Sequence, residues 1–193
     1  RELQALGHEV RLIPPQYVRP FVKTNKNDAA DAEAISEAVT RPTMRFAAAK
    51  SAEQQSVLML HRARELLVRQ RTMAINALRG HCAEFGIVVA QGAPKVEELI
   101  AIIEDSDDMR LPALAREALG ALVGQLRSAQ GRIKALEARL TAWHRSNEAS
   151  RRLAAIPGVG VITATALVAT IGDAAQFRSG RQLSAWLGLV PRQ

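Results

Sequence analysis

Cysteine is almost absent from the sequence, because Cys82 is the one thiol among 193 residues. A single cysteine cannot form a disulfide within the chain, which excludes the small secreted domains that depend on such bonds. Cys82 lies in a stretch with a helical pattern, so we expect it to fill space in a core. This cysteine usage fits the reducing cytosol.

Long apolar runs are missing as well. No stretch of about 18 apolar residues occurs that could cross a membrane, and no charged-then-apolar leader precedes a cleavage site. We therefore expect a cytoplasmic protein with no membrane partner. The sequence starts at Arg1, without Met and within a helical pattern, so we expect it to be a piece of something longer.

Acidic residues are outnumbered in the chain. The sequence has 26 Lys and Arg against 19 Asp and Glu, a formal charge of +7, and an isoelectric point near 10.5. This balance favours a polyanionic partner, although a positive chain can also simply be soluble. Aromatic residues make up only 4% of the chain, which leaves few side chains to stack on bases.

The first 48 residues alternate between helix and strand signals. A helical pattern at Arg1–Leu6 stops at Gly7, and the alternating stretch His8–Ile13 is typical of a strand that ends before two prolines. Asn27 and Asp28 then offer a helix N-cap to the alanine-rich stretch 29–39. The pattern predicts a small α-β-α unit.

Two long helices are predicted for the middle of the chain. Residues 52–86 have a charged helical pattern, and a second stretch carries an apolar seam spaced 3-4-3-4-3-4-3. That spacing is typical of a coiled coil. A loop-rich connection between the helices favours an antiparallel hairpin, which we interpret as an arm for packing or for homo-oligomer formation. The seam consists of Leu119, Leu122, Leu126, Ala129, Ile133, Leu136, Leu140 and Trp143.

Basic side chains gather in two places. One is the short basic, amide-rich run with Lys23 and Lys26, and the other is the first long helix. Several of these cations could reach the phosphates of a nucleic acid. A solvated basic face explains those on the helix equally well, and the sequence does not separate the two interpretations. The helix carries His61, Arg62, Arg64, Arg69 and Arg71.

A tight turn joins two helical patterns near the end of the chain. The stretch PGVG, residues 157–160, has the form of a helix-hairpin-helix. Gly158 and Gly160 would let the backbone approach a phosphate, and the N–H groups at the start of the next helix would bind the anion. The alternative is a structural corner, since any sharp turn between helices also favours glycine.

Two aspartates stand at the start of the predicted helix after residue 27. Asp28 and Asp31 are three residues apart, so both carboxylates can point from one face of the helix. Hard cations such as Mg²⁺ take oxygen ligands of this kind. The competing interpretation is that both acids only complement the helix dipole and cap the helix.

Several stretches together resemble a known family. GHEVRLIPP, KNDAADAEAI, and the C-terminal stretch from IPGVG to AWLGLVP occur in this order. The chain resembles, over almost its whole length, the DEDD-type transposases of bacterial insertion sequences, whose members include bridge-RNA-guided recombinases. That resemblance implies a RuvC-like, RNase H-type fold with four acids, the last two being the aspartates of a DxxD motif. Asp28 and Asp31 match that motif.

The resemblance also implies what surrounds these residues in the family. The other two acids are expected upstream of this sequence, and a serine nucleophile in a Ser-Gly motif is expected downstream. Ser179 and Ser184 lie too early to match that serine. In the family, Mg²⁺ acts near the scissile phosphate, serine attacks the DNA strand, and a guide RNA selects the DNA by base pairing.

The expected fold class is mainly α with a small α/β part. We assign residues 1–48 to the C-terminal part of a RuvC-like catalytic domain, 49–147 to a coiled-coil arm, and 148–193 to the start of a hairpin-containing transposase domain. The expected function is a DNA transposase or recombinase that works with DNA and a guide RNA, near the nucleoid. The alternatives are a RuvC-like junction nuclease and a non-enzymatic coiled-coil protein that binds nucleic acid.

Overall fold

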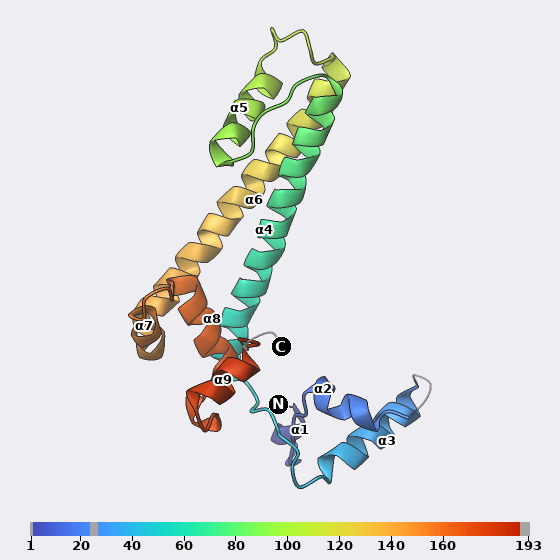
Figure 1. Ribbon diagram of the computed structural model, residues 1–193, viewed down its shortest axis with the longest axis vertical. Coiled ribbons are helices and arrows are strands. Elements are labelled where there is room, and N and C mark those ends of the chain that lie inside the picture. The colour runs from blue at the N-terminus through green and yellow to red at the C-terminus, as the bar shows by residue number, and fades with distance from the viewer. Residues whose placement is uncertain (1, 24–26, 190–193) are drawn as a thin grey trace. The chain divides into compact units, whose positions relative to one another are not determined.

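The computed structural model describes residues 2–23 and 27–189 of the chain (Figure 1). Almost all of the regular structure in these residues is helical, which confirms the mainly α fold class. The chain divides into two compact units, Arg1–Ser51 and Ala52–Gln193, and each is described by itself.

The described residues of the first unit form three short helical pieces and one longer helix. The short pieces are α1 (Glu2–Ala5), α2 (Pro15–Val18) and the 3-10 helix η1 (Arg19–Phe21), and the longer helix is α3 (Asp28–Val39). Gly7 follows α1 with φ 87°, a conformation that glycine adopts without steric cost, so the predicted stop after this helix is confirmed.

The strand predicted at His8–Ile13 is wrong. In the described part of this unit, only Leu12 pairs with another segment, in an isolated antiparallel bridge to Ala47. The N–H of Ala47 donates a hydrogen bond to the carbonyl of Leu12 at 2.7 Å. A strand needs a neighbouring strand to pair its backbone groups, and the described residues supply a single bridge. The small α/β part is therefore not formed here.

Small side chains and cation–π contacts hold the first unit together. Ala34 and Ala38 of α3 are buried, which lets neighbouring backbone approach this face closely. The guanidinium of Arg41 lies 5.4 Å from the ring centre of Phe21, and that of Arg11 lies 5.3 Å from the ring centre of Phe46. Each such contact stabilises an exposed site by about 0.5–1 kcal/mol.

The second unit is built on two long helices. These are α4 (Ala52–Glu84) and α6 (Ala113–Ser146), which lie side by side and run in opposite directions (Figure 1). Helix α5 (Ala93–Glu104) packs beside the end of the pair where the chain turns back. No helix of the described residues is both long and apolar enough to cross a membrane.

The apolar seam predicted on α6 faces the interior of this unit. Leu126 and Leu140 are completely buried, while Leu122, Leu136 and Trp143 are partly buried. Burial of a leucine side chain contributes about 1.5–3 kcal/mol, so the seam accounts for much of the packing between the two helices. Supercoiling of the pair stays a prediction. The buried seam residues are Leu119, Leu126, Ala129, Ile133 and Leu140.

The main core lies where α5 joins the long pair. Its buried residues include Cys82, as predicted, and Val123, which stands beside the predicted seam. An arginine of α6 fixes the end of α5: Arg116 donates hydrogen bonds to the carbonyls of Ile103 at 2.7 Å and Asp108 at 2.6 Å. The last carbonyls of a helix have no partner within it, so Arg116 satisfies groups that packing would otherwise leave unpaired.

Short helices surround the opposite end of the long pair. They are α7 (Glu148–Ala154), α8 (Val161–Ile171), η2 (Ala174–Gln176) and α9 (Gly180–Trp186). Helix α8 contacts both α4 and α6. A second core cluster there contains Val57, Leu140 and Ala169, one residue from each of the three helices.

Candidate functional site

The acidic motif stands in the first turn of α3. Asn27 caps this helix, because its Oδ1 accepts a hydrogen bond from the N–H of Ala30 at 2.7 Å. Asp28 and Asp31 therefore do not serve as side-chain caps. Asp28 is exposed and Asp31 is half-buried. Neither carboxylate forms a hydrogen bond or an ion pair with the described residues of the chain.

Two free carboxylates have suitable chemistry for a divalent metal but are an incomplete ligand set. Asp28 and Asp31 offer hard oxygen ligands from one helix face, which is what Mg²⁺ takes. Mg²⁺ has six ligands, and no group of three or more His, Cys, Asp or Glu side chains within residues 2–23 and 27–189 is arranged to hold a metal. Further ligands would have to be water, phosphate, backbone or amide oxygens, or groups outside the described residues.

Lys23 does not stand free beside the acidic motif. Its Nζ lies 2.5 Å from Oε1 of Glu33, which is on α3. The hydrogen bond and charge of Glu33 raise the pKa of Lys23. Contact with a phosphate would have to compete with this exposed ion pair. Lys26, the other lysine predicted to contact nucleic acid here, lies outside the described residues.

The basic run on α4 divides between two faces of the helix. Arg62 and Arg69 are exposed, whereas Arg64 points toward α6, where its Nε donates a hydrogen bond to Oε1 of Glu137 at 2.7 Å. Arg71 is half-buried and lines a cavity. Arg62 and Arg69 are therefore placed to meet a polyanion, although Arg69 also lies 3.9 Å from the carboxylate of Glu65 on the same helix. Arg64 instead has a partner on α6.

A histidine joins α4 to α8. His61 Nε2 lies 3.1 Å from the hydroxyl of Thr165, a side chain that is completely buried. The Thr165 hydroxyl donates to the carbonyl of Val161 at 2.9 Å, so its oxygen can accept the His61 N–H. Burial and the neighbouring Arg64 lower the pKa of His61 from its ordinary value of 6.5. This contact fixes the helix that follows the hairpin turn.

The predicted hairpin is formed between α7 and α8. Gly158 has φ +86°, which strains any other residue, and it makes the turn possible. Gly160 is the N-cap of α8 with φ −79° and ψ 169°, a conformation open to all residues. No heavy atom outside the neighbouring residues lies within 4 Å of a Cβ built on either glycine. No side chain caps α8, so its first N–H groups are available to an anion.

Two side-chain pairs that no sequence pattern indicated lie at this end of the second unit. His144 Nδ1 lies 2.8 Å from the buried hydroxyl of Ser150, and the indole N–H of Trp143 donates to Glu53 at 2.7 Å. The Trp143 contact joins residues 90 positions apart, so local sequence carries no signal for it. The first pair joins α6 to α7, and the second joins α6 to α4.

Two family profiles match the chain. One, described as "Transposase" and named for a DEDD transposase of IS110, matches residues 2–86, which include Asp28 and Asp31. The other, described as "Transposase IS116/IS110/IS902 family", matches residues 150–193, which include the hairpin. No solved structure gives a significant match.

Curated relatives align with the whole chain. A "Probable family 20 transposase" of Pseudomonas aeruginosa is 48% identical over 194 residues, which cover 100% of this chain and 57% of the relative. The transposase for insertion sequence element IS1111A of Coxiella burnetii is 42% identical, over 100% of this chain and 53% of the relative. The transposase for insertion sequence element IS1328 of Yersinia enterocolitica is 40% identical, over 100% of this chain and 57% of the relative. The chain spans about half the length of these relatives.

The two profiles and the relatives define one class, the transposases of bacterial insertion sequences. Both matched segments carry the motifs on which the sequence resemblance depends. The chain belongs to the DEDD-type IS110/IS116/IS902 transposase family.

Proposed function

We propose that this chain is part of a transposase that cleaves and rejoins DNA strands at a Mg²⁺-dependent site containing Asp28 and Asp31. The observation that supports this most directly is the free state of both carboxylates. Asn27 performs the capping, so of the two competing explanations for acids at the start of α3 only interaction with the helix dipole remains. The two aspartates also lie within the segment that matches the DEDD transposase profile.

Asp28 and Asp31 would hold the metal through carboxylate oxygens. A bound Mg²⁺ would supply Lewis-acid stabilisation of the charge that develops on phosphate oxygens during strand transfer. The aspartates would keep the ion in place, and the rigid start of α3 would fix their spacing. No serine of this chain is assigned as the nucleophile. Ser179 Oγ accepts a hydrogen bond from the N–H of Gln182 at 3.3 Å and caps α9.

Nucleic acid would contact the chain through its backbone phosphates. Arg62 and Arg69 are exposed on α4, and the uncapped start of α8 after Gly160 offers N–H groups. Both kinds of contact are independent of base sequence. Such contacts suit a protein whose target is chosen by pairing with a guide RNA. A protein of this kind would work in the bacterial cytoplasm, at the nucleoid.

We also propose that the helical pair mediates homo-oligomer formation. The exposed large apolar residues of α4 are Met59, Leu66 and Met73, which are 69%, 51% and 69% exposed. They recur every seven residues and so follow one stripe along the helix. The three-part division into residues 1–48, 49–147 and 148–193 is part of this proposal, with the middle part as the oligomer-forming arm.

Product analysis separates the proposal from its alternatives. A protein containing this chain, supplied with DNA, guide RNA and Mg²⁺, should yield strands rejoined to new partners, and a chelator should abolish them. Hydrolysed ends without rejoined strands would indicate the junction nuclease, which uses the same acids with water. Binding without any cleavage in Mg²⁺ would favour the non-enzymatic nucleic-acid-binding protein.

A further inference from the structure

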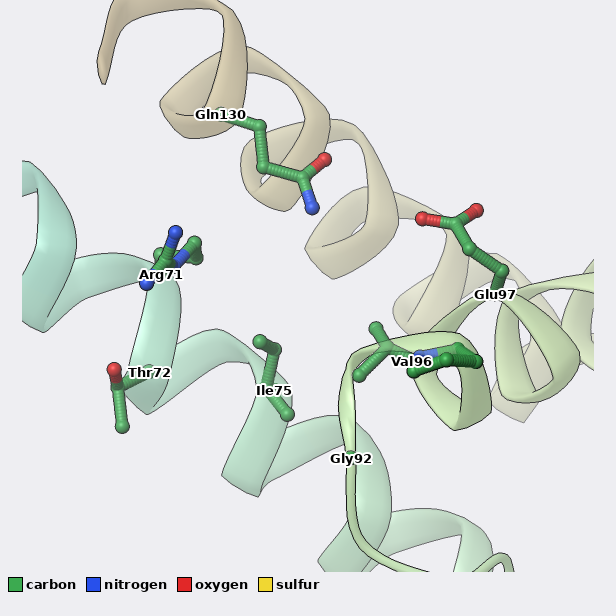
Figure 2. A pocket seen from close by; sticks show the side chains of 8 residues that line it. Arg71, Thr72, Ile75, Gly92, Val96, Glu97 and Gln130 are labelled. Carbon is green, nitrogen blue, oxygen red and sulfur yellow. The ribbon is translucent and has the colours of Figure 1, made fainter. Parts of the chain in front are cut away.

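A cavity of about 560 Å³ opens between α4, α5 and α6, remote in sequence from the acidic motif and the hairpin. Arg71 and Ile75 of α4 border it, together with Gly92, Val96 and Glu97 at the start of α5 and Gln130 of α6. Figure 2 shows that Gln130 and Glu97 extend their amide and carboxylate toward the space between the helices. Its volume is within the range of about 300–1,000 Å³ that small-molecule sites occupy.

Three polar side chains that line this cavity, Arg71, Glu97 and Gln130, have no hydrogen-bond partners in the described chain. Arg71 and Gln130 are both half-buried, and neither side chain is engaged by a neighbour. Glu97 is exposed and also makes no hydrogen bond, although its charge acts on Arg127. Packed polar side chains usually find partners within the protein or in water. Three convergent groups without a protein partner are therefore available to a ligand.

The chemistry of these groups defines the ligand. Arg71 supplies only donors and suits a phosphate, whereas the carboxylate of Glu97 supplies only acceptors and suits an amino group. Gln130 has both a donor and an acceptor and can pair with the edge of a base. Ile75 and the buried Val96 give the cavity an apolar wall for a flat ring. A phosphate, an amino-bearing ring and apolar faces occur together in a nucleotide.

We propose that this cavity binds a single unpaired nucleotide of the nucleic-acid partner, with a preference for bases that carry an amino group. Arg71 holds the phosphate, Glu97 accepts hydrogen bonds from the amino group, and Gln130 pairs with a second position on the base edge. The proposal rests on the proposed function, because a nucleic-acid partner is what brings unpaired nucleotides to this helical pair. Bases of single-stranded segments are read in this way by their edges.

The test is titration of the chain with four nucleoside monophosphates, CMP, GMP, AMP and UMP, followed through the NMR signals of the cavity residues. CMP, GMP and AMP should shift these signals saturably, and UMP should bind more weakly, because its ring N–H stands between two carbonyl oxygens that repel a carboxylate. Glu97→Gln should remove this preference and weaken binding of the amino-bearing nucleotides about tenfold. Arg71→Gln should weaken all four.

Matched variants on the same helices provide the controls. Glu98→Gln removes the same charge one residue away on α5, at a side chain paired with Lys95, and Arg139→Gln removes an exposed guanidinium from α6. Both should bind nucleotides like the parent chain. The inference is overturned if Glu98→Gln and Glu97→Gln have equal effects on nucleotide binding. It is also overturned if inorganic phosphate, at the same concentration as the nucleotide, displaces every nucleotide, or if no nucleotide shifts these signals.

The two proposals fail in different ways. If a protein containing the chain rejoins DNA strands but the cavity binds no nucleotide, only the nucleotide site is disproved. If the cavity binds nucleotides while that protein neither binds nor cleaves DNA, the proposed function is disproved and the cavity remains a nucleotide site.

Discussion

Arg64 and Glu137 join the two long helices through a hydrogen-bonded ion pair, with the guanidinium Nε 2.7 Å from the carboxylate oxygen. The residues are 73 positions apart in sequence, and both side chains are partly exposed. Arg64 differs in this contact from the neighbouring arginines of α4, which have no partner on α6. The arginines of this helix should therefore differ in their roles.

Substitution of these arginines should distinguish packing from nucleic-acid contact. Arg62→Gln and Arg69→Gln should weaken binding of unrelated DNA and RNA alike, and should reduce the salt dependence by about one phosphate contact each. Arg64→Gln should instead lower the free energy of unfolding by up to about 1 kcal/mol. Salt-dependent binding and thermal melting measure the two effects. An equal salt dependence of binding for all three variants would contradict this division between nucleic-acid contact by Arg62 and Arg69 and packing by Arg64.

Leu126 should be the most sensitive position of the α6 seam. Its side chain is completely buried between the helices, so Leu126→Ala should cost about 2–5 kcal/mol of unfolding free energy. Leu114→Ala makes the same change on the same helix at a side chain that is 83% exposed, and it should cost less than about 0.5 kcal/mol. Urea unfolding measures both. Similar costs would show that the seam is not the core.

The stability of the second unit should depend on the state of His61. Burial and Arg64 lower its pKa in the folded chain, so the unfolded chain takes up the proton more readily. The stabilisation is therefore fully present above pH 6.5, the ordinary pKa, and is lost as the pH falls below it toward the lowered folded pKa.

Urea unfolding between pH 5 and 8 tests this dependence. His61→Asn should make the free energy of unfolding depend less on pH between pH 5 and 8. His81→Asn, an exposed substitution on the same helix, should leave most of that pH dependence in place. A parent chain whose stability rises as the pH falls from 7 to 5.5 would contradict the assignment to His61.

The two hairpin glycines should respond differently to substitution. Gly160→Val should leave the fold intact, because the backbone there is extended and space around the Cβ is open. Gly158→Val should cost about 1–3 kcal/mol, because φ is +86°. If α8 binds a phosphate, folded Gly160→Val should bind DNA and RNA more weakly by a similar factor. Unchanged binding at all salt concentrations would leave the hairpin as a structural corner.

Local sequence was enough to predict the features that depend on neighbouring residues. Asn27 is followed by an alanine-rich stretch, and α3 begins there. The 3-4 spacing after Leu119 correctly predicted the buried face of α6, and the glycine at residue 158 correctly indicated the hairpin turn. In each case the cause is local: a cap, a helical repeat, or a backbone angle that only glycine adopts easily.

Features that depend on distant residues could not be predicted in this way. The alternation at His8–Ile13 has the period of a strand, but pairing requires a partner, and Ala47 supplies one bridge. The basic run on α4 gave no sign that Arg64 would meet Glu137 or that His61 would meet Thr165. The cavity beside Arg71 needs residues from three helices. Tertiary contacts decide all of these.

The strand-cleavage rate of the Asp31→Asn variant tests the central claim, that Asp31 belongs to the metal site, most directly. It should be measured in a protein that contains this chain and is active on DNA, beside Glu33→Gln, a matched loss of charge on α3 at a residue paired with Lys23. We predict that Asp31→Asn lowers the Mg²⁺-dependent cleavage rate by at least about a hundredfold, with nucleic-acid affinity largely preserved, while Glu33→Gln cleaves like the parent. Cleavage by Asp31→Asn at a rate near that of the parent would contradict the assignment of Asp31 to the metal site.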